Sequence, residues 1–430
     1  MNVAFFISTP VMKKRVLAPW RPMSTLTPTA SGEINGAQRA LWISTLAFTL
    51  CFAVWTIFSI IGVRIKQQLG LSETQFGLLI GTPILTGSLV RLVLGIWTVR
   101  YGGRLVYTTT MIVAAIATLL LSYAKTYPEM LLAALGVGLA GGSFAVGIAY
   151  VSPFFPPKKQ GTVLGIFGAG NVGAAVTKFL APLVLLAWGW PAVPQIWALV
   201  LAIMAAVFWF SAPKDPAPRT ARRYSFLQEL APLRKLQVWR FSLYYFFAFG
   251  GFVALALWLP RYLVGVYHFD LETAGMVAAV YSIPGSIFRA FGGYMSDRIG
   301  ARAVMYATLA VTAVACLILS LPAITPAVFV VVIFVLGFFM SLGKAAVYKH
   351  IPAYYPDGVG AVGGVVGMIG GLGGFILPIA FGYLKDATGL WPSCFMLLFA
   401  IGASSLLCMH LSIRRMPDAN VGAERVPVTA

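Results

Sequence analysis

The feature that most constrains this chain is a series of twelve apolar segments, each long enough to cross the ~30 Å hydrocarbon core of a membrane as a helix. Of the 430 residues, 59% are hydrophobic and 10% are charged. A soluble domain has about 45–50% apolar and about 25% charged residues, so the composition excludes a soluble enzyme, and the apolar content excludes a disordered chain. The sequence predicts an all-α membrane protein with spans at 40–63, 75–98, 104–124, 128–153, 161–187, 192–212, 240–266, 272–297, 302–321, 325–349, 358–384 and 392–413.

The longest connection, 213–239, is polar and basic, and it divides the chain into two halves of six spans, 40–212 and 240–413. Polar tails precede and follow them at 1–39 and 414–430. If the N-terminus is cytoplasmic, the loops and tails on that side hold 22 Lys and Arg residues and the other side holds five. Basic residues gather in cytoplasmic loops, so both termini are predicted to be cytoplasmic. The net charge of +19 then reflects topology, and nucleic-acid binding is not expected.

Four cations lie inside the predicted spans: Arg91, Lys178, Arg289 and Lys344. All twelve acids fall in loops, tails or span ends, so these cations lack the usual partners. A charge at a span centre costs roughly 2.5–3.5 kcal/mol on insertion scales, which makes a bound anion the simplest partner. Two guanidinium forks suit a small planar oxyanion. The alternative is that each arginine bonds backbone carbonyls or extends to the cytoplasmic surface.

An internal repeat places two of these cations at equivalent positions. The series Arg91, Gly95, Arg100, Gly102 and Arg104 recurs 198 residues later as Arg289, Gly293, Arg298, Gly300 and Arg302. Two six-span halves of the same topology form the parallel repeat of a secondary transporter, whose substrate site lies between the halves near the bilayer midplane. We therefore expect Arg91 and Arg289 to face each other across that site.

The two lysines are less constrained by pattern. Lys178 lies in mid-span near Pro182, where an extended side chain that reaches the surface is as consistent with the sequence as a functional role. Lys344 has no counterpart in the repeat, because Ala145 takes the equivalent place. A buried lysine loses its proton readily, so Lys344 is a candidate proton carrier. A gate ion pair and a surface-reaching side chain are its alternatives.

The segment from Gly293 to Arg302 resembles the cytoplasmic loop signature G-x-x-x-D-R-x-G-x-R of the major facilitator superfamily, with Asp297 and Arg298 at the D-R positions. The resemblance implies the major facilitator fold of two six-helix pseudo-repeats. In that family the acid helps to close the cytoplasmic side. Val99 takes its place in the first-half copy, which puts that latch in question for the N-terminal half.

Two glycine runs open spans five and eleven, and small residues in membrane helices allow close packing of backbones. Their members include Gly165, Gly168, Gly170, Gly173, Gly364, Gly367, Gly370 and Gly371. The stretch from Gly168 to Gly173 also fits G-x-G-x-x-G, but a dinucleotide site needs a preceding strand and an acid about 20 residues later. Here the run lies in an apolar span, so that interpretation is rejected. Asn171, a polar amide among these glycines, is able to point donors at an anion.

The paired glycine runs, together with Gly141–Ala145 and Tyr245–Gly250, resemble the nitrate/nitrite porters of the same superfamily over 40–413. That family binds nitrate between two arginines, with aromatic rings above and below its plane. The resemblance implies that two pairs of side chains bind the anion and that a third pair encloses it. Arg91 and Arg289 would supply charge, Asn171 and Tyr245 hydrogen bonds, and Phe144 and Phe249 the rings.

The segment Gly343–Pro352 is more similar to the proton-symport branch of that family than to the nitrate/nitrite-exchange branch. The resemblance therefore implies a monomeric inner-membrane porter that imports nitrate with protons, with nitrate/nitrite exchange as the alternative. Another anion exchanger is disfavoured, because organophosphate exchangers carry their arginines on spans one and seven. A transporter-like nutrient sensor would need a signalling appendage that short tails do not provide. No metal site, cofactor or enzyme activity is expected from the scattered histidines and cysteines.

Overall fold

The computed structural model describes residues 30–156, 160–215, 231–321, 324–355 and 359–414, and every element in these ranges is a helix. The N-terminal half holds α1 (Ala30–Trp55), α2 (Phe58–Leu69), α3 (Glu73–Tyr101), α4 (Gly103–Leu121), α5 (Tyr127–Val137), η1 (Gly138–Gly142), α6 (Ser143–Val151), η2 (Ser152–Phe154), α7 (Gln160–Gly168), η4 (Ala169–Val172), α8 (Gly173–Trp188) and α9 (Ala192–Ser211). The C-terminal half holds η5 (Ala231–Arg234), α11 (Leu236–Tyr245), η6 (Phe246–Gly251), α12 (Phe252–Tyr267), α13 (Leu271–Ile287), α14 (Arg289–Ile299), α15 (Ala301–Leu319), α16 (Pro326–Tyr354), α17 (Val359–Thr388) and α18 (Ser393–Arg414).

Twelve membrane spans account for these helices. Within the described residues, eleven stretches of helix are long and apolar enough to cross a bilayer, and α13 with α14 forms a twelfth span that bends by 42°. This confirms the predicted all-α fold. The first helix begins at Ala30 rather than at residue 40. Its first turns carry polar residues such as Ser31 and Glu33, so the hydropathy of the sequence did not mark them as part of the helix.

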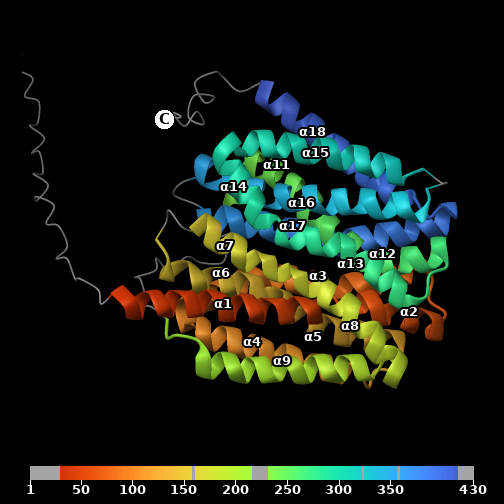
Figure 1. The fold of residues 1–430 in the computed structure, drawn as a ribbon, viewed down its shortest axis with the longest axis horizontal. Coiled ribbons are helices and arrows are strands. Elements are labelled where there is room, and N and C mark those ends of the chain that lie inside the picture. The colour runs from red at the N-terminus through yellow and green to blue at the C-terminus, as the bar shows by residue number, and fades with distance from the viewer. Residues whose placement is uncertain (1–29, 157–159, 216–230, 322–323, 356–358, 415–430) are drawn as a thin grey trace, which may run out of the picture.

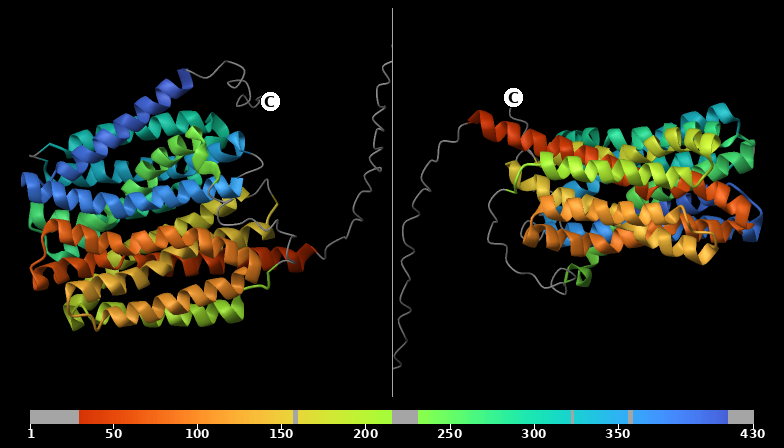
Figure 2. Two further views of the ribbon diagram at one scale, coloured as in Figure 1. Left: turned by 180° about the vertical axis from the view of Figure 1, so that it is seen from behind. Right: turned by 90° about the horizontal axis from the view of Figure 1, so that it is seen from below.

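The two halves lie side by side, with the N-terminal half below and the C-terminal half above in Figure 1. The start of α1 and the end of α18 lie at the same end of the bundle, which we call the terminal end; the opposite end is the far end (Figures 1 and 2). The halves meet along two long seams. In one seam α3 packs on α17, and in the other α7 and α8 pack on α14 and α13.

Matched turns confirm the internal repeat. Gly102 joins α3 to α4 with φ +91° and ψ +140°, and Gly300 joins α14 to α15 with φ +88° and ψ +140°. Both residues occupy a region that side chains rarely adopt, which explains why glycine stands in both copies. The symmetry fails in the preceding spans, because α3 runs unbroken past Pro83 whereas its counterpart breaks at Phe288.

Besides span one, which is interrupted between α1 and α2, four spans change their helical geometry near the middle of the bundle. Span four contains the 3₁₀ segment η1, span five the 3₁₀ segment η4, span seven the π-helical segment η6, and span eight the break before α14. The first two segments are rich in glycine, which is a weak helix former. Such irregular turns are frequent at functional sites, and these four surround the same region of the seam.

Candidate anion-binding site

Arg91 of α3 and Arg289 at the start of α14 lie together on opposite halves. Each residue is only 6% exposed, which rules out side chains that reach the membrane surface. Both guanidinium carbons lie over the ring of Phe144, at 5.4 Å for Arg91 and 5.3 Å for Arg289 from the ring centroid. The structure thus brings the two repeat-related cations to one aromatic ring.

The two arginines differ in how their donors are used. Arg91 Nε donates to the Gly141 carbonyl at 3.5 Å, and its Nη1 donates across the seam to the Gly367 carbonyl at 3.3 Å. These bonds are long, because good N–H···O bonds are about 2.9–3.0 Å. Arg289 Nη1 is buried without a hydrogen-bond partner in the described part of the chain. Backbone carbonyls therefore satisfy Arg91 weakly and leave donor capacity free on both side chains.

Asn171 and Tyr245 bring further unpaired polar atoms. Both amide atoms of Asn171 and the hydroxyl of Tyr245 are buried, and none has a hydrogen-bond partner among the described residues. Asn171 lies in η4, and a methyl group on the nearby Gly168 would stand 3.0 Å from Arg289 Cδ, so this segment packs on that arginine. Buried polar groups are normally paired, so such a cluster indicates a missing polar ligand.

Aromatic rings enclose the arginines. Phe249, in the π-helical segment, lies with its ring centroid 5.2 Å from the Arg91 guanidinium carbon. It also stacks on Tyr245 at 5.1 Å with an interplanar angle of 7°. Phe144 packs on Phe48 and Phe167. The two rings predicted to sandwich an anion therefore both lie against Arg91.

Sequence reasoning missed two aromatic residues of this site. The ring of Trp55 lies 5.4 Å from the Arg91 guanidinium carbon, and its indole donates to the Pro83 carbonyl at 2.8 Å. The ring of Tyr348 lies 5.9 Å from the Arg289 guanidinium carbon and packs edge-on against Tyr245 at 5.0 Å. Tyr348 lies in the Gly343–Pro352 segment that the sequence singled out, whereas Trp55 carried no signal of its own.

The eight signature glycines lie where other residues approach their backbone closely. A methyl group added to any of them would lie within 3.2 Å of another residue. At Gly371 it would meet Ser88 Oγ and stand 3.4 Å from Arg91 Nη1. Each of the others faces one nearby residue: Gly165 faces Ala290, Gly168 faces Arg289, Gly170 faces Phe48, Gly173 faces Thr49, Gly364 faces Leu92, Gly367 faces Tyr348 and Gly370 faces Tyr245.

The two intramembrane lysines lie outside the arginine cluster, and both are fully buried. Lys344 donates to the Gly285 carbonyl, and its Nζ lies 3.5 Å from the centroid of the Phe252 ring. Gly285 is four residues before Arg289, so Lys344 stands about one turn behind that arginine. Lys178 Nζ donates to the Ala174 carbonyl at 3.2 Å. Neither lysine reaches the surface, and neither forms an ion pair with an acid of the described residues.

The signature residues Asp297 and Arg298 lie at the terminal end. Asp297 forms an ion pair with Lys349, which belongs to its own half, and both side chains are about half exposed. Arg298 packs over the ring of Tyr294. In the first half, where Val99 replaces the acid, Asp215 accepts hydrogen bonds from the backbone N–H groups of Gly103 at 2.6 Å and Arg104 at 3.3 Å. These contacts stabilise each half and do not join the two halves.

Polar contacts do join the halves at the far end. Glu73 of α3 accepts two hydrogen bonds from Arg261 of α12, one of them 3.2 Å long, and Lys66 lies 3.5 Å from the same carboxylate. Asp386 of α17 caps the first turn of α3, accepting from the N–H groups of Glu73 at 3.1 Å and Thr74 at 2.8 Å. We call these contacts the far-end latch. They close the far end between the halves.

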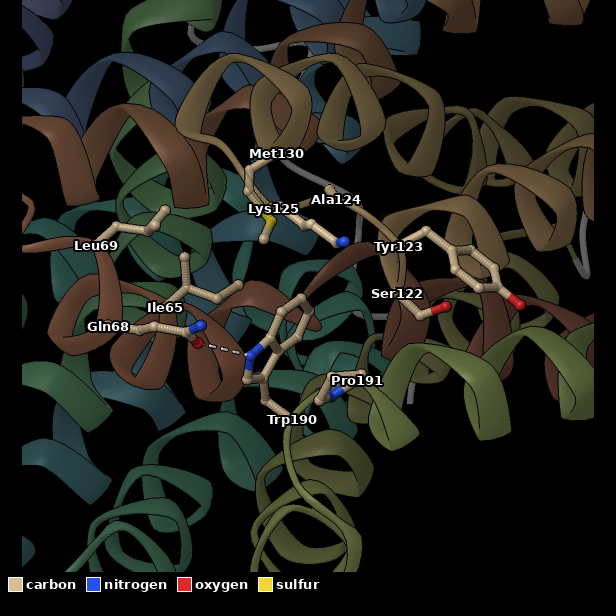
Figure 3. Close-up of a pocket in the computed structure, with 10 residues that line it drawn as sticks. All are labelled: Ile65, Gln68, Leu69, Ser122, Tyr123, Ala124, Lys125, Met130, Trp190 and Pro191. Atoms are coloured by element: carbon tan, nitrogen blue, oxygen red, sulfur yellow. Dashed lines mark hydrogen bonds between the residues drawn. The ribbon is translucent and has the colours of Figure 1, made fainter.

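A surface hollow at the far end is separate from the arginine cluster (Figure 3). It lies between the end of α2, the turn before α5 and the turn between α8 and α9, all in the N-terminal half. The Trp190 indole donates to Gln68 Oε1 across it at 3.0 Å. None of its lining residues is a predicted substrate ligand. Among the described residues there is also no cluster of three side chains able to hold a metal ion.

Comparisons with known proteins show which proteins this chain resembles. The family model of the Major Facilitator Superfamily matches residues 43–277 and 267–428. The chain is 45% identical over 409 residues to the "Probable nitrate/nitrite antiporter NarK1" of Thermus thermophilus, covering 88% of this chain and 92% of the relative. It is 29% identical to the "Nitrite extrusion protein" of Bacillus subtilis, over 87% of this chain and 94% of the relative.

A further relative and a solved structure point the same way. The "Probable nitrate transporter NarT" of Staphylococcus carnosus is 30% identical, over 86% of this chain and 95% of the relative. The crystal structure of a bacterial homologue of the human lysosomal transporter Spinster, inward-facing and occupied, matches with a TM-score of 0.69 at 18% identity. It covers 91% of this chain and 99% of that one, and at this identity the match supports the fold alone. All of these relatives are transporters rather than enzymes.

Proposed function

We propose that this chain, which belongs to the nitrate/nitrite porters of the major facilitator superfamily, carries nitrate across the cell membrane by alternating access and couples it to protons. The single observation that carries the substrate assignment is the cluster of unpaired buried polar atoms on Asn171, Tyr245 and Arg289 beside a second arginine. A small anion with several acceptor oxygens accepts hydrogen bonds from the Arg289 guanidinium, the Asn171 amide nitrogen and the Tyr245 hydroxyl at once. The names of the relatives supply nitrate and nitrite as that anion.

The shape of the site favours a planar anion. Arg91 lies against both Phe144 and Phe249, so an anion bound to its guanidinium fork lies between flat rings. Nitrate spreads one charge over a plane and presents acceptors around its edge, which matches two forks and two neutral donors. A tetrahedral phosphate would push against the rings, and spherical chloride has no plane to fit between them and no separate oxygens to meet the two forks.

The anion also supplies the free energy that moves the halves. Arg91 and Arg289 come from opposite halves, so without an anion their like charges repel across the seam. An anion between them turns this repulsion into attraction and favours a closed site. A ligand shifts a conformational equilibrium only by its difference in affinity between the states, and this bridging contact provides such a difference. The loaded site therefore passes between inward-open and outward-open states more readily than the empty one.

Lys344 is the residue we assign to proton coupling. Its amine is buried one turn behind Arg289 and bonds only a backbone carbonyl and a ring face. An anion beside Arg289 favours a positive charge on a nearby amine, whereas an empty site leaves that amine beside an unneutralised arginine. Nitrate and a proton would then bind together and leave together. The described spans place no carboxylate at the site that would serve instead.

The alternative is exchange of nitrate for nitrite. The printed name of the Thermus relative favours it, and the absence of a carboxylate from the described arginine cluster is consistent with it. Exchange needs no proton carrier, because the protein makes the return step with nitrite bound in its site. Lys344 would then be a structural charge that orders the break before α14.

The remaining assignments follow from charge and size. Basic residues dominate the loops at the terminal end, so we place both termini in the cytoplasm and the far end at the outer face. The lipid bilayer is the cell, or inner, membrane. One chain contains both arginines and a complete site, so a monomer suffices for transport.

Uptake of nitrate into proteoliposomes separates the two mechanisms. With no nitrite inside, symport predicts uptake that rises with an inward proton gradient, and exchange predicts uptake only when nitrite is trapped inside. Under symport, Lys344→Met should lose the stimulation by the gradient and Lys344→Arg should retain a charge but lose the proton cycle. Lys349→Met, which removes a cation from an exposed ion pair on the same helix, is the matched control. Failure of the folded wild-type protein to move nitrate in either condition would contradict the proposed substrate.

A further inference from the structure

Lys178 is a buried cation that the proposed transport cycle leaves without a role. Its side chain is fully buried in α8, and its Nζ donates to the Ala174 carbonyl at 3.2 Å, one turn earlier on the same helix. An ammonium group has three donors, and no acidic side chain in the described part of the chain forms an ion pair with it. A buried charge held by one carbonyl is poorly compensated, so its most favourable partner is an anion.

The position of Lys178 places it on the seam between the halves. α8 packs against α13 of the other half, as Figure 1 shows. A methyl group on Gly275 of α13 would lie 2.5 Å from the Lys178 carbonyl oxygen and 3.2 Å from Pro182 Cγ. The backbone at Lys178 therefore touches the C-terminal half directly. Any motion that parts the two halves at the far end must separate these two helices.

The side chain of Lys178 also lies in line with the anion site. Lys178 follows Asn171 by seven residues, which is nearly two turns, so the two residues share one helix face. Side chains on a helix lean toward its N-terminus, and the bond to Ala174 shows this lean. Ala174 is three residues, or about 4.5 Å of helical rise, beyond Asn171. The ammonium group thus lies about one turn along the helix from Asn171, toward the far end.

We propose that Lys178 forms a second anion position, at which nitrate stops between the outer mouth and the Arg91–Arg289 pair. The inference rests on the proposed function. When the far end opens, α8 parts from α13 and the ammonium faces the outer vestibule. It then binds a monovalent oxyanion and passes it to Asn171 one turn deeper. Lys178 has no part in the path to the terminal end, so its contribution is to the affinity measured from outside.

Transport measured separately from each face tests this assignment. Right-side-out vesicles report nitrate uptake from the outer face, and inverted vesicles report it from the inner face. We expect Lys178→Met to raise the outer-face KM about tenfold, the loss typical of one charge-assisted hydrogen bond. The inner-face KM should not change. Lys178→Arg should keep the outer-face KM within about threefold of wild type, because the charge remains.

Lys125→Met is the matched control, because it removes an exposed cation near the same end of the same half, away from the seam. It should leave both KM values unchanged, and thermal unfolding in detergent should show that all variants are folded. An outer-face KM for Lys178→Met equal to that of wild type would overturn the proposal. Equal damage to both faces, or equal damage from Met and Arg, would overturn it in favour of a packing role.

Two further outcomes have defined meanings. If Lys178→Met abolishes stimulation by a proton gradient but keeps the outer-face KM, Lys178 is a proton carrier and the anion position is wrong. If the wild-type vesicles move no nitrate at all, the proposed function fails instead, and the Lys178 proposal falls with it. If wild-type transport is normal and the outer-face KM of Lys178→Met is unchanged, only the second anion position is contradicted.

Discussion

Arg91 and Arg289 place two positive charges in a buried site that contains no acid among its described neighbours. Anion binding at this site depends on the two parallel donors of each guanidinium group and on a charge that is not lost on burial, rather than on positive charge alone. A lysine at either position keeps the charge but presents a single point of contact, and it loses its proton more easily when buried. The anion would then no longer be held in a fixed orientation toward the unpaired atoms of Asn171 and Tyr245.

We therefore predict that Arg91→Lys or Arg289→Lys abolishes nitrate transport. Loss of one charge-assisted hydrogen bond costs about 1.5–3 kcal/mol, or roughly tenfold to a hundredfold in affinity, before any change in the transport rate. Initial uptake rates in proteoliposomes and nitrate binding to the purified variants measure both effects. Arg298→Lys, which removes a fork from an exposed ring contact in the same half, is the control. Near-normal uptake by either buried-site variant would remove the paired-fork mechanism.

Helix geometry, at the next scale, explains why these residues converge. Asn171, Phe249 and Arg289 lie in or directly after irregular turns of their spans. The glycine runs of spans five and eleven allow the helices of the two halves to touch. Gly371 shows this close approach, because α17 passes Ser88 and Arg91 of α3 at a distance that leaves no room for a side chain.

A methyl group at this contact should therefore damage the site. We predict that Gly371→Ala lowers nitrate uptake at least about tenfold and destabilises the fold by about 1–3 kcal/mol, as overpacking does. Gly293→Ala is the matched control, because nothing lies within 4 Å of the position that its methyl group would take. Alanine is favoured in helices over glycine by up to ~1 kcal/mol, so the control should be neutral or stabilising. Thermal unfolding and uptake assays should separate the two variants, and equal behaviour would contradict the packing argument.

Across the part of the molecule that the structure describes, the charged contacts between the halves lie at the far end. Glu73, Arg261 and Asp386 join the halves there, whereas Asp297 pairs with Lys349 of its own half and Asp215 bonds the start of α4 at the terminal end. The far-end latch therefore stabilises states that are closed at the far end. Opening that end must break an ion pair and uncap the first turn of α3.

Removing the far-end latch should shift the population toward outward-open states. We predict that Glu73→Gln combined with Asp386→Asn widens the far end, measured as a longer distance between spin labels on α2 and α12. Asp270→Asn is the control, because Asp270 caps α13 through the Thr273 N–H at 2.8 Å within one half. That bond lowers the pKa of Asp270, so the control also removes a carboxylate that is charged at neutral pH. An unchanged distance in the double variant would show that the far-end latch does not set the equilibrium.

The sequence alone predicted the spans and the pairing of two arginines, but not the contacts that depend on distant segments. Hydropathy predicted the spans because each one must satisfy its own backbone in lipid. The repeat predicted that Arg91 and Arg289 would meet, since equivalent positions face one axis. It did not predict the break at Phe288, because α3 carries the same arginine in a continuous helix. Trp55 and the far-end latch also depend on contacts between distant segments, which no local pattern records.

A structure determined with saturating nitrate, compared with one determined in chloride, tests whether the arginine pair binds nitrate. We predict one flat density between the Arg91 and Arg289 guanidinium groups, within hydrogen-bond distance of Asn171 and Tyr245, that is present only with nitrate. Nitrate bound elsewhere, or no density at this site in a protein that transports nitrate, would contradict it.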